Sequence, residues 1–247
     1  MDLELSGRTA IVCGASSGIG LGIAESLRAE GASVVMFARR RELIEHEAAR
    51  IGGLPVVGDV TSAEDLERLV QTAVDTYGGI DILVNNSGGP PRATASELDA
   101  EQVEGAVQLL LVSIVRLTGL CLPHLERSSG GRIVNVTSTT VREPIDNLAL
   151  SNVVRPGVVG WAKSLARELG PKGITVNCVA PGRIDTDRIR EVYPDGPSEA
   201  DLATIPLRRL GTTQEIGDVV AFLCSERASY VSGTVLLVDG ALTRGLW

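Results

Sequence analysis

The chain has 247 residues, of which 44% are hydrophobic, and its formal net charge is −8. This length and composition suit one domain with a sizeable core. An acidic chain without long basic runs is a poor ligand for nucleic acid or an anionic membrane, so we expect neither as a partner.

We expect no membrane span, because the most apolar stretch, residues 107–122, is interrupted by Ser113, Arg116 and Gly119. The first residues contain no basic segment followed by a long apolar run, so a secretory signal is not expected. With two histidines in the chain, a histidine-built metal site is not expected either. Buried free thiols in a reducing cytoplasm are the simplest interpretation of the four scattered cysteines: Cys13, Cys121, Cys178 and Cys224.

Short β-branched runs alternate with longer helical patterns along the whole chain. In chain order, we expect strands at residues 8–13, 33–38, 56–57, 81–85, 132–137, 174–180 and 235–238. Helices are expected at residues 19–30, 42–51, 62–77, 96–125, 150–169 and 212–223. The strands are continuous apolar runs, which are typical of a parallel sheet covered on both faces. The alternation predicts one Rossmann-type α/β domain over residues 1–247, with about seven strands in a doubly wound parallel sheet and helices on both faces.

One segment, residues 183–210, breaks this rhythm. It contains Pro194, Pro197 and Pro206, polar residues and little periodicity. A loop this long inside a compact domain is usually functional or disordered. We interpret it as a substrate lid, with disorder in the free protein as the alternative.

A glycine-rich turn follows the first expected strand and reads Gly14-Ala15-Ser16-Ser17-Gly18-Ile19-Gly20. Small residues let the backbone turn tightly and approach a pyrophosphate, and the next helix offers free N–H groups to the phosphates. A strand-to-helix turn also needs glycine for structural reasons. Its position between the first strand and the first helix nevertheless favours a dinucleotide site.

The turn resembles the fingerprint of the short-chain dehydrogenase/reductase family, although Cys13 stands where most members have threonine. Further motifs resemble the family in the same order: Asp59-Val60, Asn85-Asn86-Ser87-Gly88, Pro181-Gly182 with Thr186, and Val238-Asp239-Gly240. The resemblance spans nearly the whole chain and extends to 3-oxoacyl-carrier-protein reductase-like members. It implies a nucleotide held by Gly14, Ser16, Ser17, Gly18, Ile19, Gly20, Arg39, Arg40, Asp59, Val60, Asn86, Ser87, Gly88, Arg155, Pro181, Gly182, Ile184 and Thr186.

The residues after the second strand bear on which nucleotide is used. An acid there would accept hydrogen bonds from a free ribose 2′-hydroxyl, but the sequence has Arg39, Arg40 and Arg41 instead. A guanidinium can pair with a 2′-phosphate, so we expect NADP(H) in preference to NAD(H). Ser17 weakens this expectation, because many NADP-dependent relatives carry a basic residue inside the glycine turn.

The resemblance also implies a catalytic serine, tyrosine, lysine and asparagine, with which family members reduce carbonyls by hydride transfer. Ser138 matches the serine. The register set by downstream motifs places Ser151 at the tyrosine position and Arg155 at the lysine position, and Leu110 stands for the asparagine. A serine hydroxyl is a far weaker acid than tyrosine, arginine stays protonated, and leucine cannot bind a relay water.

Two interpretations remain open. In the first, the protein is an NADP(H)-dependent oxidoreductase that interconverts carbonyl and alcohol on a small or acyl-type substrate, with Ser138, Ser151 and Arg155 as its catalytic residues. A water or Tyr193 in the lid would then give the proton, although an ordinary loop aromatic explains Tyr193 more simply. In the second, the chain is a catalytically silent nucleotide-binding sensor, or the inactive subunit of a hetero-oligomer.

Only the family resemblance indicates a substrate class and an assembly for this protein. The lid arginines would suit an anionic carbonyl compound such as an acyl thioester on a carrier, although solvation explains most of them: Arg183, Arg188, Arg190, Arg208 and Arg209. Relatives form tetramers through two long helices, and residues 103–122 and 153–169 carry more apolar side chains than one face needs. We expect a homotetramer, with a hetero-oligomer as the alternative.

Overall fold

The computed structural model describes residues 2–246 and contains one sheet of seven parallel strands. The strand order is β3-β2-β1-β4-β5-β6-β7, so the chain reverses its direction of travel across the sheet between β1 and β4. This confirms the predicted doubly wound α/β fold. The strands are β1 (Thr9–Cys13), β2 (Ser33–Ala38), β3 (Leu54–Val57), β4 (Ile82–Asn85), β5 (Arg132–Val136), β6 (Thr175–Pro181) and β7 (Val235–Val238).

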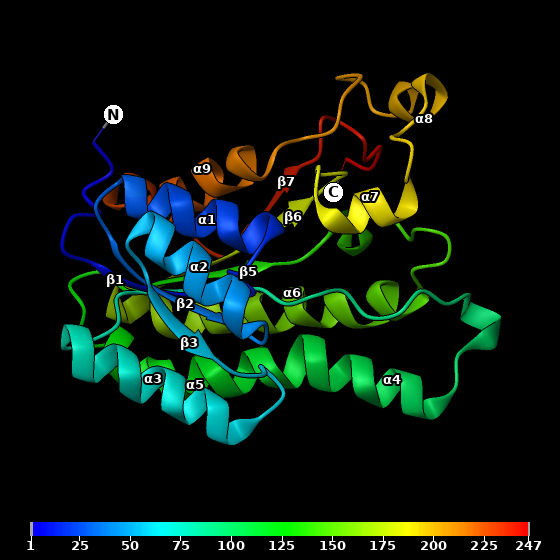
Figure 1. Cartoon of the computed structure of the whole chain (residues 1–247). Coiled ribbons are helices and arrows are strands. Elements are labelled where there is room, and N and C mark those ends of the chain that lie inside the picture. The colour runs from blue at the N-terminus through cyan, green and yellow to red at the C-terminus, as the bar shows by residue number, and fades with distance from the viewer. Residues whose placement is uncertain (1, 247) are drawn as a thin grey trace.

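Helices cover both faces of the sheet, and strand residues alternate between the two layers (Figure 1). Ala10 and Val12 pack in the core beneath α1, α2 and α9, whereas Ile11 and Cys13 pack in the core beneath α3, α5 and α6. Because both faces are covered, most positions of a central strand are apolar, and the polar exceptions such as Asn85 and Asn135 hydrogen-bond each other. The helices are α1 (Gly18–Ala29), α2 (Arg41–Ile51), α3 (Ala63–Tyr77), α4 (Ala100–Val107), α5 (Ser113–Leu125), α6 (Ala149–Leu169), α7 (Asp187–Val192), α8 (Glu199–Ala203) and α9 (Thr213–Cys224).

Side-chain caps fix where two of these helices begin. The Thr212 hydroxyl accepts a hydrogen bond from the Glu215 amide at 3.1 Å, and the Glu215 carboxylate accepts one from the Thr212 amide at 2.8 Å. At α3 the Ser62 hydroxyl accepts from the Asp65 amide at 3.2 Å. The Asp65 carboxylate accepts from the Asp59 amide at 2.9 Å, so this cap also holds the loop after β3.

The helix expected at residues 96–125 is divided in three. A π-helical segment, Gln108–Val112, separates α4 from α5. Leu110 lies in this segment and packs in a small buried cluster with Leu150 and Val154 of α6. A π-helical turn inserts one residue into the repeat, and apolar periodicity over thirty residues does not reveal where the insertion falls.

The lid region also differs from expectation. Residues 183–210 were predicted to lack regular structure, but they contain the short helices α7 and α8. The Ser198 hydroxyl accepts from the Asp201 amide and caps the start of α8. The nearby prolines indicated an irregular segment here instead of a helix start. Helices this short have little periodicity to detect, so the prediction of an irregular loop was wrong there.

One helical stretch, Ala100–Leu125, is long and apolar enough to cross a membrane by length and composition alone. The interruptions at Ser113, Arg116 and Gly119 therefore do not exclude a span by this criterion, contrary to the expectation. In this structure 39% of its most apolar window is buried within the domain. It packs against α3, α6 and β4, in the lower layer of Figure 1. Its apolar residues thus contribute to the core of the α/β domain.

The four cysteines are free thiols in the core. Burial raises the pKa of Cys13 to about 12 and that of Cys178 to about 11. The thiolate is the reactive form, so these two groups are chemically inert at neutral pH. Within residues 2–246, no cluster of three or more histidine, cysteine or acidic side chains is placed to hold a metal ion.

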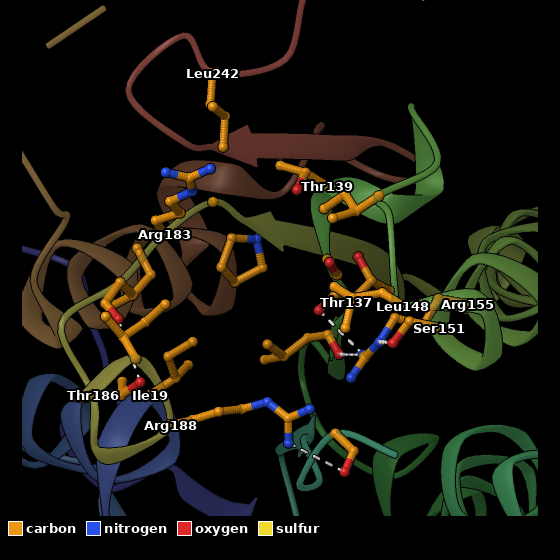
Figure 2. Close-up of a pocket in the computed structure, with 18 of the residues that line it drawn as sticks. Ile19, Thr137, Thr139, Leu148, Ser151, Arg155, Arg183, Thr186, Arg188 and Leu242 are labelled. Atoms are coloured by element: carbon orange, nitrogen blue, oxygen red, sulfur yellow. Dashed lines mark hydrogen bonds between the residues drawn. The ribbon is translucent and has the colours of Figure 1, made fainter. Parts of the chain in front are cut away.

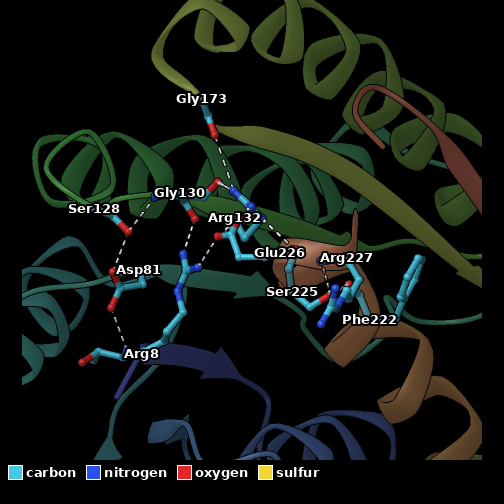
Figure 3. A network of polar contacts seen from close by, with 12 residues as sticks. Arg8, Asp81, Ser128, Gly130, Arg132, Gly173, Phe222, Ser225, Glu226 and Arg227 are labelled. Carbon is cyan, nitrogen blue, oxygen red and sulfur yellow. Dashed lines mark hydrogen bonds and ion pairs between the residues drawn. The ribbon is translucent and has the colours of Figure 1, made fainter. Parts of the chain in front are cut away.

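A polar network lies at the amino ends of the strands, opposite the edge where the glycine-rich turn lies (Figure 3). Arg8 and Arg132 share the carboxylate of Glu226 at 2.7 and 3.1 Å. Arg132 is only 1% exposed. Asp81, just before β4, accepts from the Thr9 amide at 2.8 Å and ties β1 to the same region. The network joins the two halves of the sheet.

Candidate active site

The glycine-rich turn leaves β1 and leads into α1 at the carboxyl edge of the sheet. A Cβ atom on Gly20 would lie 2.2 Å from the Gly14 carbonyl oxygen. A Cβ atom on Gly14 would lie 2.7 Å from the side-chain amide nitrogen of Asn86. Gly18 has a φ of +56°, which disfavours any larger residue. The Ser17 side chain does not cap α1, so the first amides of this helix remain available to an anion.

A cleft of about 510 Å³ opens beside this turn. It is lined by the turn itself, by the residues after β2 and β3, and by the loop after β4. Of the residues expected to hold a nucleotide, the following line this cleft: Gly14, Ser16, Ser17, Gly18, Ile19, Gly20, Arg39, Arg40, Asp59, Val60, Asn86, Ser87, Gly88 and Thr186. Segments that are far apart in sequence therefore meet here, because parallel strands place all their carboxyl ends at one edge.

Two of the arginines after β2 are held against the cleft. Arg40 donates to the Ser17 hydroxyl at 2.5 Å and to the Ser16 hydroxyl at 3.2 Å. Arg39 lies 3.6 Å from the Asp59 carboxylate across the same end of the cleft. Arg41 turns away and pairs with Glu45 on α2 at 3.0 Å, so it does not line the cleft.

A second cavity, of about 650 Å³, adjoins the cleft (Figure 2). The two spaces share wall residues, namely Ile19, Asn86, Ser87, Gly89, Thr186 and Arg188. The cavity contains the three expected catalytic residues, Ser138, Ser151 and Arg155. The remaining residues expected at the nicotinamide end, Pro181, Gly182 and Ile184, also line it.

Arg155 and Ser151 lie one turn apart on α6 and face the cavity together (Figure 2). Arg155 donates through Nη1 to the carbonyl oxygens of Val136 and Thr137 at 3.2 and 3.1 Å. Its Nε lies 3.5 Å from the Ser151 hydroxyl oxygen. Ser138 begins a short 3₁₀ turn at the end of β5 and accepts from the Thr140 amide at 3.2 Å. The Ser151 hydroxyl thus lies beside a half-buried cation, and Ser138 lines the same cavity.

Arg155 lies in an environment that disfavours its charge. Burial lowers the pKa of Arg155 to about 10, and the positive charge of Arg188 contributes to the same shift. Arg155 is still a cation at neutral pH. A fixed positive charge in a site with little water stabilises a developing negative charge strongly.

Leu110 and Tyr193, which were considered from sequence, are placed less favourably for a role in proton transfer. Leu110 is 1% exposed and faces α6, so it does not line the cavity. Tyr193 does line the cavity. The pKa of Asp201 on α8 is lowered chiefly by hydrogen bonds from Ser198, and Tyr193 contributes to the same shift. This tyrosine therefore lies near α8 of the lid.

Two wall residues were not singled out by sequence. Thr137 presents its carbonyl oxygen to Arg155, and Arg188 on α7 reaches the cavity from its rim (Figure 2). Arg188 was one of five lid arginines, and sequence contains no signal for which of them face inward. Arg183 also lines the cavity, but its Nη1 donates to the Asp201 carbonyl oxygen and the Thr204 hydroxyl. Thr137 precedes Ser138 at the end of a strand, which is where site residues gather in this fold.

Comparison with known proteins decides the family. The model described as Enoyl-(Acyl carrier protein) reductase matches residues 14–243. Dehydrogenase/reductase SDR family member 4 of Oryctolagus cuniculus is 37% identical, over 97% of this chain and 95% of the relative. The 3-oxoacyl-[acyl-carrier-protein] reductase FabG of Vibrio cholerae is also 37% identical, over 97% of this chain and 99% of the relative. The chain belongs to the short-chain dehydrogenase/reductase family.

A solved structure of another short-chain dehydrogenase/reductase is similar over its whole length. It is an NADPH-bound short-chain oxidoreductase from Pseudomonas aeruginosa PAO1, described as containing an atypical catalytic center. The TM-score is 0.92, with 30% identity over 98% of each chain. These relatives are oxidoreductases, which agrees with a short-chain dehydrogenase/reductase that uses a nicotinamide cofactor.

Proposed function

We propose that this protein is an NADP(H)-dependent oxidoreductase that interconverts a carbonyl and an alcohol on a small or acyl-type substrate, with a non-standard set of catalytic residues. The observation that carries the proposal is the shared wall between the nucleotide cleft and the cavity that holds Ser138, Ser151 and Arg155. A cofactor in the cleft and a substrate in the cavity would meet at this wall. The FabG relative supports an acyl-type substrate as one class.

The residues at the cleft fit a dinucleotide. Gly14 and Gly20 let the turn fold tightly, because a Cβ atom on either would clash with Asn86 or with the turn itself, and the open amides of α1 suit a pyrophosphate. Arg39 and Arg40 line the end of the cleft after β2, where they would favour a 2′-phosphate. The NADPH-bound relative supports the same preference. When bound, the nicotinamide supplies or accepts the hydride.

The catalytic roles follow from the residues around the cavity. The Ser138 and Ser151 hydroxyls would donate hydrogen bonds to the substrate oxygen and fix its position. Arg155 would stabilise negative charge that develops on that oxygen. Neither serine is acidic enough to replace a tyrosine, so the proton would come from a water or from a lid residue such as Tyr193. The lid, residues 183–210, would exclude bulk water during the reaction.

A catalytically silent protein is the second candidate. Its support is that Ser151, Arg155 and Leu110 occupy the positions at which the family resemblance implies tyrosine, lysine and asparagine. Such a protein would bind the nucleotide as a sensor or act as the inactive subunit of a hetero-oligomer. The oxidoreductase and the sensor both require the cleft to bind NADPH, whereas an inactive subunit does not. Only the oxidoreductase transfers hydride.

Assembly and location are part of the proposal. Val115 on α5 and Val153 on α6 are 41% and 57% exposed, which supports a homotetramer formed through these helices. The buried free thiols support a cytoplasmic location. Light scattering after size-exclusion chromatography would contradict the tetramer if it gave only a monomer.

Calorimetric titration with NADPH and NADH tests the cofactor assignment. We expect NADPH to bind at least about tenfold more tightly, because guanidinium–phosphate hydrogen bonds are charge-assisted. Arg40→Ala should reduce this preference. The matched control is Arg41→Ala, which removes a neighbouring arginine that does not line the cleft. Equal affinities for the two nucleotides would contradict the preference, and no binding of either would contradict the oxidoreductase itself.

A further inference from the structure

The lid arginines differ in what they contact. Arg190 pairs with the carboxylates of Asp185 and Asp187 at 3.2 and 3.1 Å, and Arg209 pairs with Glu215 at 2.6 Å. Arg188 forms no ion pair within residues 2–246. Its guanidinium donates instead to the carbonyl oxygens of the loop after β4, Gly89 and Pro90, at 3.4 and 3.1 Å.

Arg155, on the opposite wall of the cavity, likewise forms no ion pair within residues 2–246. Its Nη1 and Nε contact two carbonyl oxygens and a hydroxyl, and among residues 2–246 no carboxylate pairs with it. Its Nη2 has no hydrogen-bond partner among the same residues. Figure 2 shows both guanidinium groups directed into the space between α6 and α7. A half-buried cation without a counter-ion is costly unless a ligand supplies the negative charge.

The fold accommodates this arginine pair, Arg155 and Arg188. A Cβ atom on Gly89 would lie 2.9 Å from Cζ of Arg188, so only glycine leaves the guanidinium in place. Both arginines line the same cavity, and the positive charge of Arg188 contributes to the lowered pKa of Arg155. Bringing like charges together is unfavourable, and a bound anion would remove the penalty.

The cavity has two acids of its own, but they do not neutralise the pair. The Glu143 carboxylate accepts from the backbone amides of Arg244 and Gly245 at 2.6 and 2.7 Å, near the C-terminus. Asp146 is exposed. The rest of the wall around the pair is partly apolar, with Ile145, Leu148, Ile189, Val192 and Leu242.

We propose that Arg155 and Arg188 together bind a carboxylate of the substrate, so that the protein acts on oxo acids or the corresponding hydroxy acids with a small apolar substituent. This inference rests on the proposed function. The oxo group, one or two carbons from the carboxylate, would then lie beside Ser138 and Ser151. A bidentate guanidinium contact would fix the orientation of the substrate as well as its charge.

A phosphate of the cofactor is the other possible source of the negative charge. The residues that line each of the two spaces favour the substrate as the source of this charge. Arg155 lines only the cavity, whereas Gly14, Ser16 and Gly20 of the phosphate-binding turn line only the adjoining cleft. Arg188 lies at the boundary and lines both spaces, so the experiment must separate the two sources.

The test is calorimetric binding of pyruvate, 2-oxobutyrate, 2-oxoisovalerate and acetoacetate, each beside its neutral methyl ester. Titrations use the full-length protein, both without nucleotide and saturated with NADP⁺, which cannot reduce them. We expect at least one acid to bind about tenfold or more tightly than its ester, since hydrogen bonds to charged groups contribute more than neutral ones. Arg188→Met should abolish that difference and leave NADP⁺ affinity within about twofold. Arg190→Met, on the same helix but outside the cavity, should leave it intact.

The outcomes separate this inference from the proposed function. Equal affinity for every acid and its ester would overturn the carboxylate site. So would an Arg188→Met variant that loses NADP⁺ affinity tenfold while keeping the acid preference, because the arginine would then serve a cofactor phosphate. Failure of NADP⁺ to bind would contradict the proposed function alone, and the nucleotide-free titrations would still decide the carboxylate site.

Discussion

Ser151 and Arg155 occupy one turn of α6, and their chemistry differs from that of a tyrosine and a lysine in the same places. A tyrosine hydroxyl has a pKa near 10 and can be tuned toward neutrality, whereas serine is far less acidic. An arginine holds its charge more firmly than a lysine. The pair is suited to positioning and charge stabilisation, and another group must deliver the proton.

Restoring a tyrosine tests this view at the residue scale. The double substitution Ser151→Tyr with Arg155→Lys should raise the rate of NADPH-dependent carbonyl reduction by about 10²-fold, which is at the low end for a positioned general acid. The cavity next to Ser151 offers room for the larger side chain. Steady-state kinetics on the folded variant measures the change. Ser151→Phe with Arg155→Lys is the matched control, because it adds the ring without the hydroxyl and should give no gain.

A restored variant that binds NADPH and gains no activity would contradict the simple picture of a missing proton donor. It would place the deficit elsewhere, for example at Leu110, which is buried against α6 and offers no polar group to a relay water.

At the scale of elements, α1 and the turn before it form the part of the site that tolerates least change. We expect Gly20→Ala to lower NADPH affinity at least about tenfold and to lower the melting temperature, because its Cβ would overlap the Gly14 carbonyl oxygen. Calorimetry and thermal unfolding measure the two effects. Gly105→Ala in α4 is the control. A Cβ there meets no atom within 4 Å, so it should stabilise the helix by about 0.5–1 kcal/mol.

Unchanged NADPH affinity in Gly20→Ala would mean that the turn serves the fold and not the nucleotide. If Gly20→Ala and Gly105→Ala changed NADPH affinity and melting temperature to the same extent, the argument from close packing would fail, since only Gly20 lies against the backbone of the turn.

Sequence predicted the elements whose signals are local. The strand at Ser33–Ala38 has the expected bounds, and α9 begins at Thr213, one residue after the expected start. The continuous apolar strands follow from two covered faces, which the alternation of strands and helices already implies. The catalytic candidates Ser138, Ser151 and Arg155 came from the family resemblance, and the structure places all three around one cavity.

Features set by tertiary contacts were not predictable. The π-helical turn around Leu110 depends on packing between α4, α5 and α6, and α7 and α8 are too short to show a period. Likewise, the inward direction of Arg188 depends on its contacts with Gly89 and Pro90, which lie almost a hundred residues earlier in the chain.

At the scale of the whole molecule, the two edges of the sheet have separate roles. The carboxyl edge forms the cleft and the cavity, and the amino edge holds the network of Arg8, Arg132 and Glu226 (Figure 3). Burial lowers the pKa of Arg132, and Glu226 partly opposes this effect. A buried guanidinium that loses its partner is strongly destabilising.

We therefore expect Glu226→Gln to lower the free energy of unfolding by about 1–3 kcal/mol, a range that allows for the partial exposure of Glu226. Urea denaturation measures the change. Glu126→Gln, which removes a surface pair with Lys172, should cost less than about 1 kcal/mol. NADPH affinity should not change in either variant, because both sites lie away from the cleft. Equal losses in the two variants would show that the network contributes no more than a surface pair.

The most direct test of the account follows hydride transfer itself. The wild-type protein is incubated with carbonyl compounds and NADPH deuterated at the transferring carbon, and mass spectrometry measures deuterium in the alcohol product. We predict transfer to at least one compound, reduced about 10²-fold in Ser138→Ala and in Arg155→Met, which is typical when a group that stabilises the transition state is removed. No transfer to any compound by a protein that binds NADPH would contradict the oxidoreductase and leave a silent nucleotide-binding protein.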